Sequence, residues 1–203
     1  MDISTQIEKL DKWQRVALAA MCTASLSPVV VRFAQPATRR AFEQGIDAAW
    51  NSARDGGADS RTASARSTLA DLAESACDDS NVPAYEVMRA IGALACTLDA
   101  VLDDESGQAA IDTCANATEA YSGYDYVLAY GNQTRRVDPQ NPPPPGRLEA
   151  LLIQLQLRSI ERMRSANHMG GQVVGEMQDF GNQLAAELDR ALPVYAERLD
   201  WKV

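Results

Sequence analysis

Apolar residues recur at helical spacing along most of the chain, and this periodicity predicts a succession of helices. The first helix starts at a capping box at residues 5–8 and continues as an apolar stripe that breaks at Pro28. A second helix starts at Pro36, since proline suits the first turn, and stops at the glycine pair 56–57. A weaker helix is predicted over about 63–77.

The second half of the chain continues the same pattern. Pro83 opens the clearest helix, and Gly107 separates it from a further helix that carries apolar residues as far as Tyr121. Residues 148–163 are apolar in nearly all directions, which predicts a helix at the centre of the bundle. A last helix follows from about residue 174 and is interrupted at Pro193.

The predicted fold class is all-α, a single bundle of about seven helices. The bundle domain covers residues 1–170 and includes a proline-rich loop at 133–146, where consecutive prolines favour an extended spacer. Residues 171–203 form a C-terminal helical extension that docks on the bundle. No alternation long enough for a strand occurs, and residues 29–31 are interpreted as a helical turn.

Charge is distributed unevenly along the chain. The net charge is −9, which argues against a nucleic-acid partner because such proteins present basic faces. Residues 55–130 hold fourteen acidic residues against three arginines and no lysine, so this segment carries the negative field of the protein.

The four cysteines form no C-x-x-C pair, so the usual zinc and redox spacings are missing from the sequence. Each cysteine is expected to be a small buried hydrophobic side chain. The start of the sequence has no signal-peptide pattern, and the unbroken apolar runs are short, so we expect a cytoplasmic protein without a membrane span.

Little in the sequence indicates catalysis, a metal or a cofactor, and none is predicted. His168 is the single histidine, which excludes di-iron bundle sites and histidine-rich hydrolase sites. No G-x-S-x-G motif or phosphate-binding glycine loop is present. We expect His168 to be a surface or capping residue.

Acidic residues cluster at the end of the clearest helix and in the turn before its start, and they are the candidate partner-binding residues. The candidates are Asp78, Asp79, Asp99, Asp103, Asp104 and Glu105. A solvated acidic helix end is the alternative. Four tyrosines between Tyr121 and Tyr130 fit either an interface or the edge of the bundle.

The sequence resembles the YjaG-like family of all-helical bacterial proteins of unassigned function. The resemblance is carried by residues 10–14, the stretch 46–50 and the segment 85–91, and it covers about residues 5–170. It implies a helical fold and says almost nothing about function.

Three classes of function remain open. The first is a non-catalytic binding protein, most specifically an acidic immunity or antitoxin-like protein that neutralises a basic toxin, because complementary charge speeds encounter. The second is a homo-oligomeric structural or regulatory protein. The third is an enzyme that uses carboxylates and a metal.

Overall fold

A computed structural model describes residues 3–72, 82–103, 107–132, 143–166 and 169–201. All regular secondary structure in these ranges is helical, which confirms the predicted all-α class. The helices are α1 (Ile3–Ile7), α2 (Lys12–Ala24), α3 (Ser27–Phe33), α4 (Pro36–Asp55), α5 (Thr62–Ala70), α6 (Pro83–Leu102), α7 (Gly107–Tyr130), α8 (Arg147–Ser165) and α9 (Gly171–Arg198).

The described helices number nine, against the prediction of about seven. The difference arises near the N-terminus, where the structure has three helices, α1, α2 and α3, in place of the first predicted helix. The short α1 ends at Ile7, and α2 begins after Asp11, whose side chain accepts a hydrogen bond from the backbone N–H of Gln14 while the Gln14 side chain accepts one from the Asp11 backbone N–H. This pair is the capping box of α2. The capping box predicted at residues 5–8 is therefore wrong.

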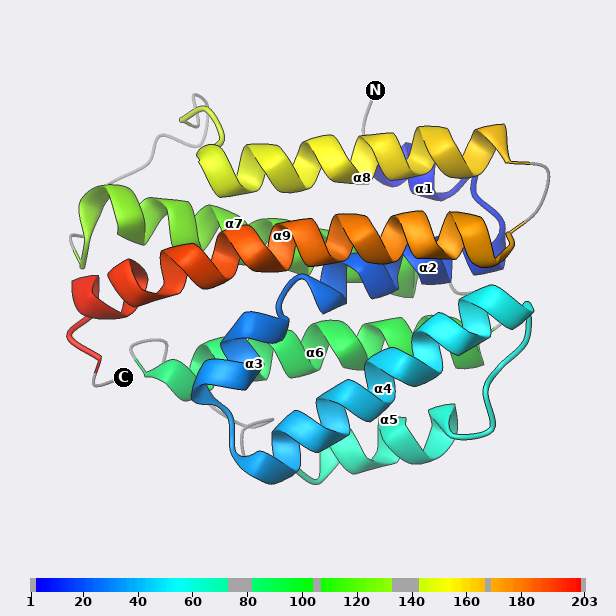
Figure 1. Cartoon of the computed structure of the whole chain (residues 1–203), viewed down its shortest axis with the longest axis horizontal. Coiled ribbons are helices and arrows are strands. Elements are labelled where there is room, and N and C mark those ends of the chain that lie inside the picture. The colour runs from blue at the N-terminus through cyan, green and yellow to red at the C-terminus, as the bar shows by residue number, and fades with distance from the viewer. Residues whose placement is uncertain (1–2, 73–81, 104–106, 133–142, 167–168, 202–203) are drawn as a thin grey trace.

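Helix α2 lies at the centre of the bundle and contacts α4, α6, α7, α8 and α9. Eight consecutive residues, Val16 to Thr23, are fully buried. Ala17, Ala19 and Ala20 let neighbouring helices approach α2 from every side, because alanine has almost no side chain to keep them apart. Figure 1 shows α2 between an upper group formed by α7, α8 and α9 and a lower group formed by α3, α4, α5 and α6.

The prediction that residues 148–163 form the central helix is wrong. Helix α8 lies at one edge of the bundle and packs on α1, α2, α7 and α9 (Figure 1). Its Leu152, Leu155 and Ile160 are buried, whereas Gln154 and Glu161 on the opposite face are exposed. The abundance of leucine in α8 reflects one well-packed face together with half-buried flanks, and the central position belongs to the alanine-rich helix.

Several helix boundaries follow local sequence signals, as predicted. Pro36 and Pro83 lie in the first turns of α4 and α6, and Gly56 ends α4 with a φ of +65°. The break predicted at Pro28 lies between Ala24 and Ser27, and Pro28 itself starts α3. Residues 29–31 belong to α3, which confirms the helical turn predicted there.

Helix α9 runs through Pro193, so the predicted interruption is wrong. Proline removes one i→i−4 hydrogen bond. The burial of Leu192 and Tyr195 on either side of Pro193 holds the last turns against the bundle. The buried residues of α9 belong to the same hydrophobic core as those of α2.

Lys12–Phe33, which includes α2 and α3, is long and apolar enough by length and composition to cross a membrane, with a mean hydropathy of 1.7. The 18-residue window of this segment that gives this mean hydropathy is 67% buried inside the bundle. The core helix of a folded domain passes the same test, so the finding adds no argument for a membrane partner.

Candidate functional site

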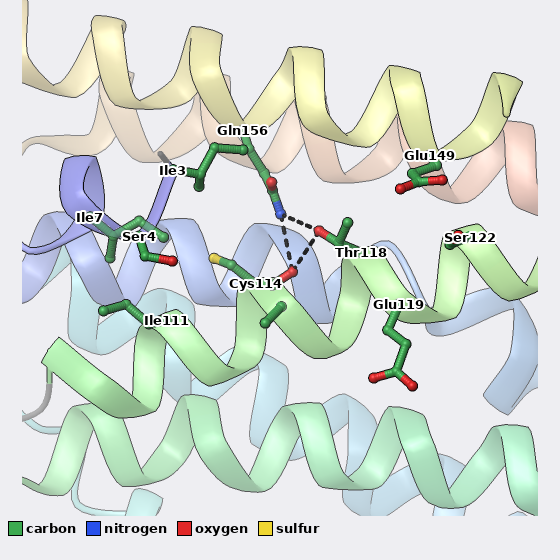
Figure 2. Close-up of a pocket in the computed structure, with 11 residues that line it drawn as sticks. Ile3, Ser4, Ile7, Ile111, Cys114, Thr118, Glu119, Ser122, Glu149 and Gln156 are labelled. Atoms are coloured by element: carbon green, nitrogen blue, oxygen red, sulfur yellow. Dashed lines mark hydrogen bonds between the residues drawn. The ribbon is translucent and has the colours of Figure 1, made fainter. Parts of the chain in front are cut away.

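A cavity of about 420 Å³ opens between α1, α7 and α8. Its walls change character along the length of α7 (Figure 2). One end is aliphatic, with Ile3 and Ile7 from α1 and Ile111 from α7. The middle is polar, and the other end carries carboxylates. The residues of the polar middle and the acidic end are Cys114, Thr118, Glu119, Ser122, Glu149 and Gln156.

Asp125 of α7 fixes the position of α8 beside this cavity. Its two carboxylate oxygens accept hydrogen bonds from the backbone N–H groups of Leu148 and Glu149, at 3.1 and 2.8 Å. These N–H groups belong to the first turn of α8 and have no acceptor within that helix. Asp125, a residue of another helix, therefore caps α8. Gly146 precedes α8, and a Cβ atom there would lie 2.4 Å from the Asp125 side chain, so glycine permits the close approach.

Gln156 is the most unusual polar residue of the cavity, because it is only 1% exposed. Its Nε2 lies 3.4 Å from the carbonyl oxygen of Cys114 and 3.5 Å from Oγ1 of Thr118, as Figure 2 shows. Nε2 also lies 3.4 Å from Sγ of Cys22. The side-chain oxygen Oε1 has no hydrogen-bond partner within the described part of the chain.

Two thiols lie beneath this amide. Sγ of Cys22 on α2 and Sγ of Cys114 on α7 are 3.7 Å apart, and both residues are buried free cysteines. The hydrogen bond with Cys22 and burial raise the pKa of Cys114 well above its usual value. A thiol held in its protonated form is a poor nucleophile. Cys22 and Cys114 are buried as predicted, whereas Cys96 is only half-buried and Cys77 lies outside the described residues.

A second cavity of about 350 Å³ adjoins the first, and Ser122 and Glu149 line both. The second cavity lies between α7 and the residues that precede α8, and its walls include Tyr126, Tyr130 and Pro143. We call the two cavities together the α7–α8 groove. Of the four clustered tyrosines, Tyr126 and Tyr130 line this groove.

The electrostatic character of the α7–α8 groove is acidic. Three carboxylates, Glu119, Asp125 and Glu149, line it. Its described lining residues include neither lysine nor arginine. The chemistry available is therefore the recognition of a cation next to an apolar surface.

The acidic helix end predicted from the sequence is only partly within the described residues. Asp99 forms a two-pronged ion pair with Arg66 of α5, at 2.7 and 3.1 Å, and this contact raises the pKa of Arg66. Asp103 follows the last residue of α6, and its backbone N–H donates to the carbonyl of Asp99. The other four acidic candidates lie outside the described ranges; they are Asp78, Asp79, Asp104 and Glu105. His168 also lies outside these ranges.

A second buried polar cluster lies at another part of α7. Glu86 of α6 is 4% exposed, and its oxygens accept hydrogen bonds from the hydroxyls of Tyr124 and Tyr195, at 3.1 and 2.9 Å. Arg89 lies 3.6 Å from the same carboxylate. Tyr121 and Tyr124 are core residues, so they lie neither at an interface nor at the bundle edge.

Within the described ranges, no three His, Cys, Asp or Glu side chains gather in a way that could hold a metal ion. Apart from Tyr126 and Tyr130, which were named from the sequence as possible interface residues, the sequence-based candidates did not include the residues that line the α7–α8 groove. One signal pointed to them, because Gln156 interrupts the apolar run of α8 on its buried face.

Comparison with known proteins gives a fold but no function. No family model matches the sequence, and no curated protein matches it. The structure is similar to the 1.91 Å crystal structure of a DUF416 family protein from Shewanella baltica OS155, with a TM-score of 0.69 and 15% sequence identity. The likeness covers 90% of this chain and 94% of that chain. Residues 1–170 make up less than 90% of this chain, so the likeness also includes part of α9. At this identity, the match shows the fold alone.

Proposed function

We propose that this chain is a non-catalytic binding protein whose α7–α8 groove receives a basic segment of a partner protein. One observation carries the proposal: Glu119, Asp125 and Glu149 line an apolar groove whose described walls hold no lysine or arginine. An occupant with both apolar and cationic side chains would match these walls in polarity and in charge.

The length and surface of the groove favour a protein segment. It continues past Ser122 and Glu149 to the half-exposed Tyr126 and to Tyr130, which is 40% exposed. Tyrosine is enriched in protein interfaces because its ring is apolar and its hydroxyl is polar. The raised pKa of Cys114 supports a role in binding, since the thiol in the groove is not activated for attack.

The specific form of this proposal is an acidic, cytoplasmic immunity-like protein that neutralises a basic toxin. The net charge of −9 supports it, because opposite charge raises the rate at which two proteins meet. We also propose membership of the YjaG-like family, on the sequence resemblance together with the likeness to a DUF416 family protein.

Self-association is the second candidate function. Val31 of α3 is 56% exposed and borders a cavity of about 150 Å³ between α3 and α4, whose walls include Phe42 and Ile46 beside the charged Arg39, Glu43 and Asp47. An exposed aliphatic side chain beside a partly apolar cavity suits contact with a second copy of the chain. Light scattering of the wild-type chain and of Val31→Asp would test this, since self-association through α3 predicts a smaller assembly for the variant.

The binding proposal is tested by association kinetics with the protein that co-purifies with the chain from its own cells. The variant Glu119→Gln with Glu149→Gln neutralises the groove. We expect its association rate to be several-fold slower, most clearly at low salt, where the Debye length exceeds about 10 Å. The matched control is Asp112→Asn with Glu161→Gln, which removes the same charge from exposed positions of α7 and α8.

A further pair, Asp99→Asn with Asp103→Asn, tests the acidic end of α6. Slower association in that pair alone would move the partner surface from the groove to α6. Equal association rates for the wild type and for the groove variant, at low salt and at high salt alike, would contradict the proposal.

A further inference from the structure

Two thiols beside the α7–α8 groove form a pair for which the proposed function has no use. We propose that Cys22 and Cys114 are a reversible redox site, where a small hydroperoxide oxidises the two thiols to a disulfide that ties α2 to α7. The inference goes beyond the proposed function and is independent of it, because the reaction needs only the two sulfurs and the oxidant.

The distance between the two sulfurs is the first observation. Sγ of Cys22 lies 3.7 Å from Sγ of Cys114, although the two residues are 92 positions apart in the sequence. A disulfide joins its sulfurs at about 2.0 Å, so the sulfurs must approach by about 1.7 Å, which is on the scale of a change in side-chain rotamer. The contact between α2 and α7 therefore holds two free thiols close to bonding distance.

The two thiols differ in how an oxidant can reach them. Cys114 is 3% exposed and belongs to the wall of the 420 Å³ cavity, as Figure 2 shows. Cys22 is fully enclosed and does not line that cavity. A water molecule takes about 30 Å³ in the liquid, and hydrogen peroxide is larger by one oxygen atom, so the cavity has room for it. Cys114 is therefore the thiol that meets the oxidant first.

Helix α1 provides the way in. It has five residues, lies next to the N-terminus and forms the wall of the cavity with Ile3, Ser4 and Ile7. Short terminal elements open at the lowest free-energy cost in a folded protein. Local opening of α1 therefore widens the approach to Cys114 without unfolding the bundle.

The reaction balances with one hydroperoxide as the two-electron oxidant. With hydrogen peroxide, the sulfur of Cys114 first takes one oxygen: an S–O bond forms, the O–O bond breaks, and the thiol proton leaves with the other oxygen as water. The sulfur of Cys22 then displaces the hydroxyl group: the S–S bond forms, the S–O bond breaks, and the Cys22 proton leaves with the hydroxyl as a second water. The two thiols are oxidised to one disulfide, and the peroxide is reduced to two waters.

The surroundings of the pair set the speed of each step. The hydrogen bond with Cys22 and burial raise the pKa of Cys114, so the first step is slow compared with the oxidation of an exposed thiol. The second step is fast, because Cys22 is already next to the oxidised sulfur. Burial also keeps out larger thiols that would otherwise form a mixed disulfide. The pair therefore responds to sustained peroxide and ends as an intramolecular disulfide.

The test treats the folded chain carrying Cys77→Ser and Cys96→Ser with hydrogen peroxide, so that Cys22 and Cys114 are the two cysteines left. Mass spectrometry of the cysteine peptides reads the products. We expect a peptide pair joined through Cys22 and Cys114, lighter by two hydrogen atoms than the separate peptides, and released by dithiothreitol. If the double variant does not fold, the same peptide map of the wild type decides.

Two further variants of this chain are matched controls. With Cys22→Ser added, the Cys114 peptide should gain oxygen, because its sulfenic acid has no neighbouring thiol to displace the hydroxyl group. With Cys114→Ser added, the Cys22 peptide should stay reduced, because Cys22 does not line the cavity.

Thermal unfolding shows whether the fold accepts the disulfide. The bond closes a long loop and restricts the unfolded chain, so the oxidised chain should melt several degrees above the same chain after dithiothreitol. Cysteine peptides that stay reduced, at a peroxide concentration that oxidises glutathione in a parallel tube, would overturn the proposal. A Cys22–Cys114 disulfide that lowers the melting temperature would also overturn it, because the folded bundle would then oppose the bond.

Discussion

Two buried polar clusters lie along α7, and they differ in one respect. Around Glu86, both carboxylate oxygens accept tyrosine hydroxyls, and Arg89 lies close by. Around Gln156, the amide nitrogen faces acceptors, while the amide oxygen has no donor within the described structure. The first cluster is paired within the described structure, and the second leaves a buried acceptor unpaired in a residue that lines a cavity.

The aromatic surroundings reinforce this difference. Tyr195 stacks edge-on against Tyr124 and Trp201, with ring centroids 5.1 and 5.3 Å apart, and Phe33 packs against Trp201. These rings join the end of α9 to α3 and α7, and the hydroxyls of Tyr124 and Tyr195 join it to Glu86 of α6. Burial of polar groups alone therefore does not indicate a binding site. A cluster whose hydrogen bonds are all made stabilises the fold, whereas a cluster with an unpaired acceptor contributes less to stability.

The largest effect that tests this contrast is expected from Glu86→Met. The substitution leaves two hydroxyls and the Arg89 guanidinium without their buried acceptor, so the free energy of unfolding should fall by about 3–5 kcal/mol. Urea denaturation measures it. Glu161→Met on the exposed face of α8 is the control, and it should change stability by less than about 0.5 kcal/mol. A loss below about 1 kcal/mol for Glu86→Met would show that the cluster is not a structural support.

Alkaline pH should weaken the same cluster. Burial and the charge of Glu86 raise the pKa values of Tyr124 and Tyr195 above the usual value of 10.0. Above about pH 10, the unfolded chain has released these protons while the folded chain retains them, so stability is full below that pH and falls as pH rises. Above that pH, each tyrosine lowers the free energy of unfolding by up to about 1.4 kcal/mol per pH unit.

Unfolding measured between pH 9 and pH 11, a range chosen around the usual tyrosine pKa of about 10, tests this expectation. Tyr195→Phe should reduce the slope of stability against pH by about half a proton at pH 10 and by nearly one proton at pH 11. Tyr126→Phe, at the half-buried surface of α7, is the control for the loss of a tyrosine as such. A slope in Tyr195→Phe identical to that of the wild type would show that Tyr195 does not keep its proton in the folded state.

The smallest effect is expected from Gln156→Met, which introduces the same side chain as Glu86→Met. It removes an unpaired oxygen together with long contacts of 3.4–3.5 Å, so stability should stay within about 1 kcal/mol of the wild type or rise. The same urea titration measures it. A loss as large as that of Glu86→Met would mean that both clusters support the fold and would remove the contrast between them.

The sequence predicted those features that local chemistry controls. Pro36, Pro83 and Gly56 mark helix ends because proline and glycine restrict or free the backbone at their own positions, whatever packs around them. The same local signals failed at Pro193, because the burial of Leu192 and Tyr195 outweighs one missing hydrogen bond.

The candidate site depends on contacts between distant segments. Gln156 meets a carbonyl 42 positions away, and the two partners Glu86 and Tyr195 are 109 positions apart. Periodicity shows which side of a helix is apolar and does not show which helices meet. The acidic residues at the end of α6 were conspicuous in the sequence, whereas Glu119 and Glu149 line one cavity only because α7 and α8 pack together.

The sequence by itself determined the all-α class, the main helix boundaries and the acidic character of the chain, because each follows from residue type and short-range spacing. Tertiary structure decided that the alanine-rich α2 is central, that Tyr124 and Tyr195 meet Glu86, and that the oxygen of Gln156 is unpaired beside a cavity. These features depend on which surfaces fit together, since close packing selects among many pairings that the same amphipathic patterns allow.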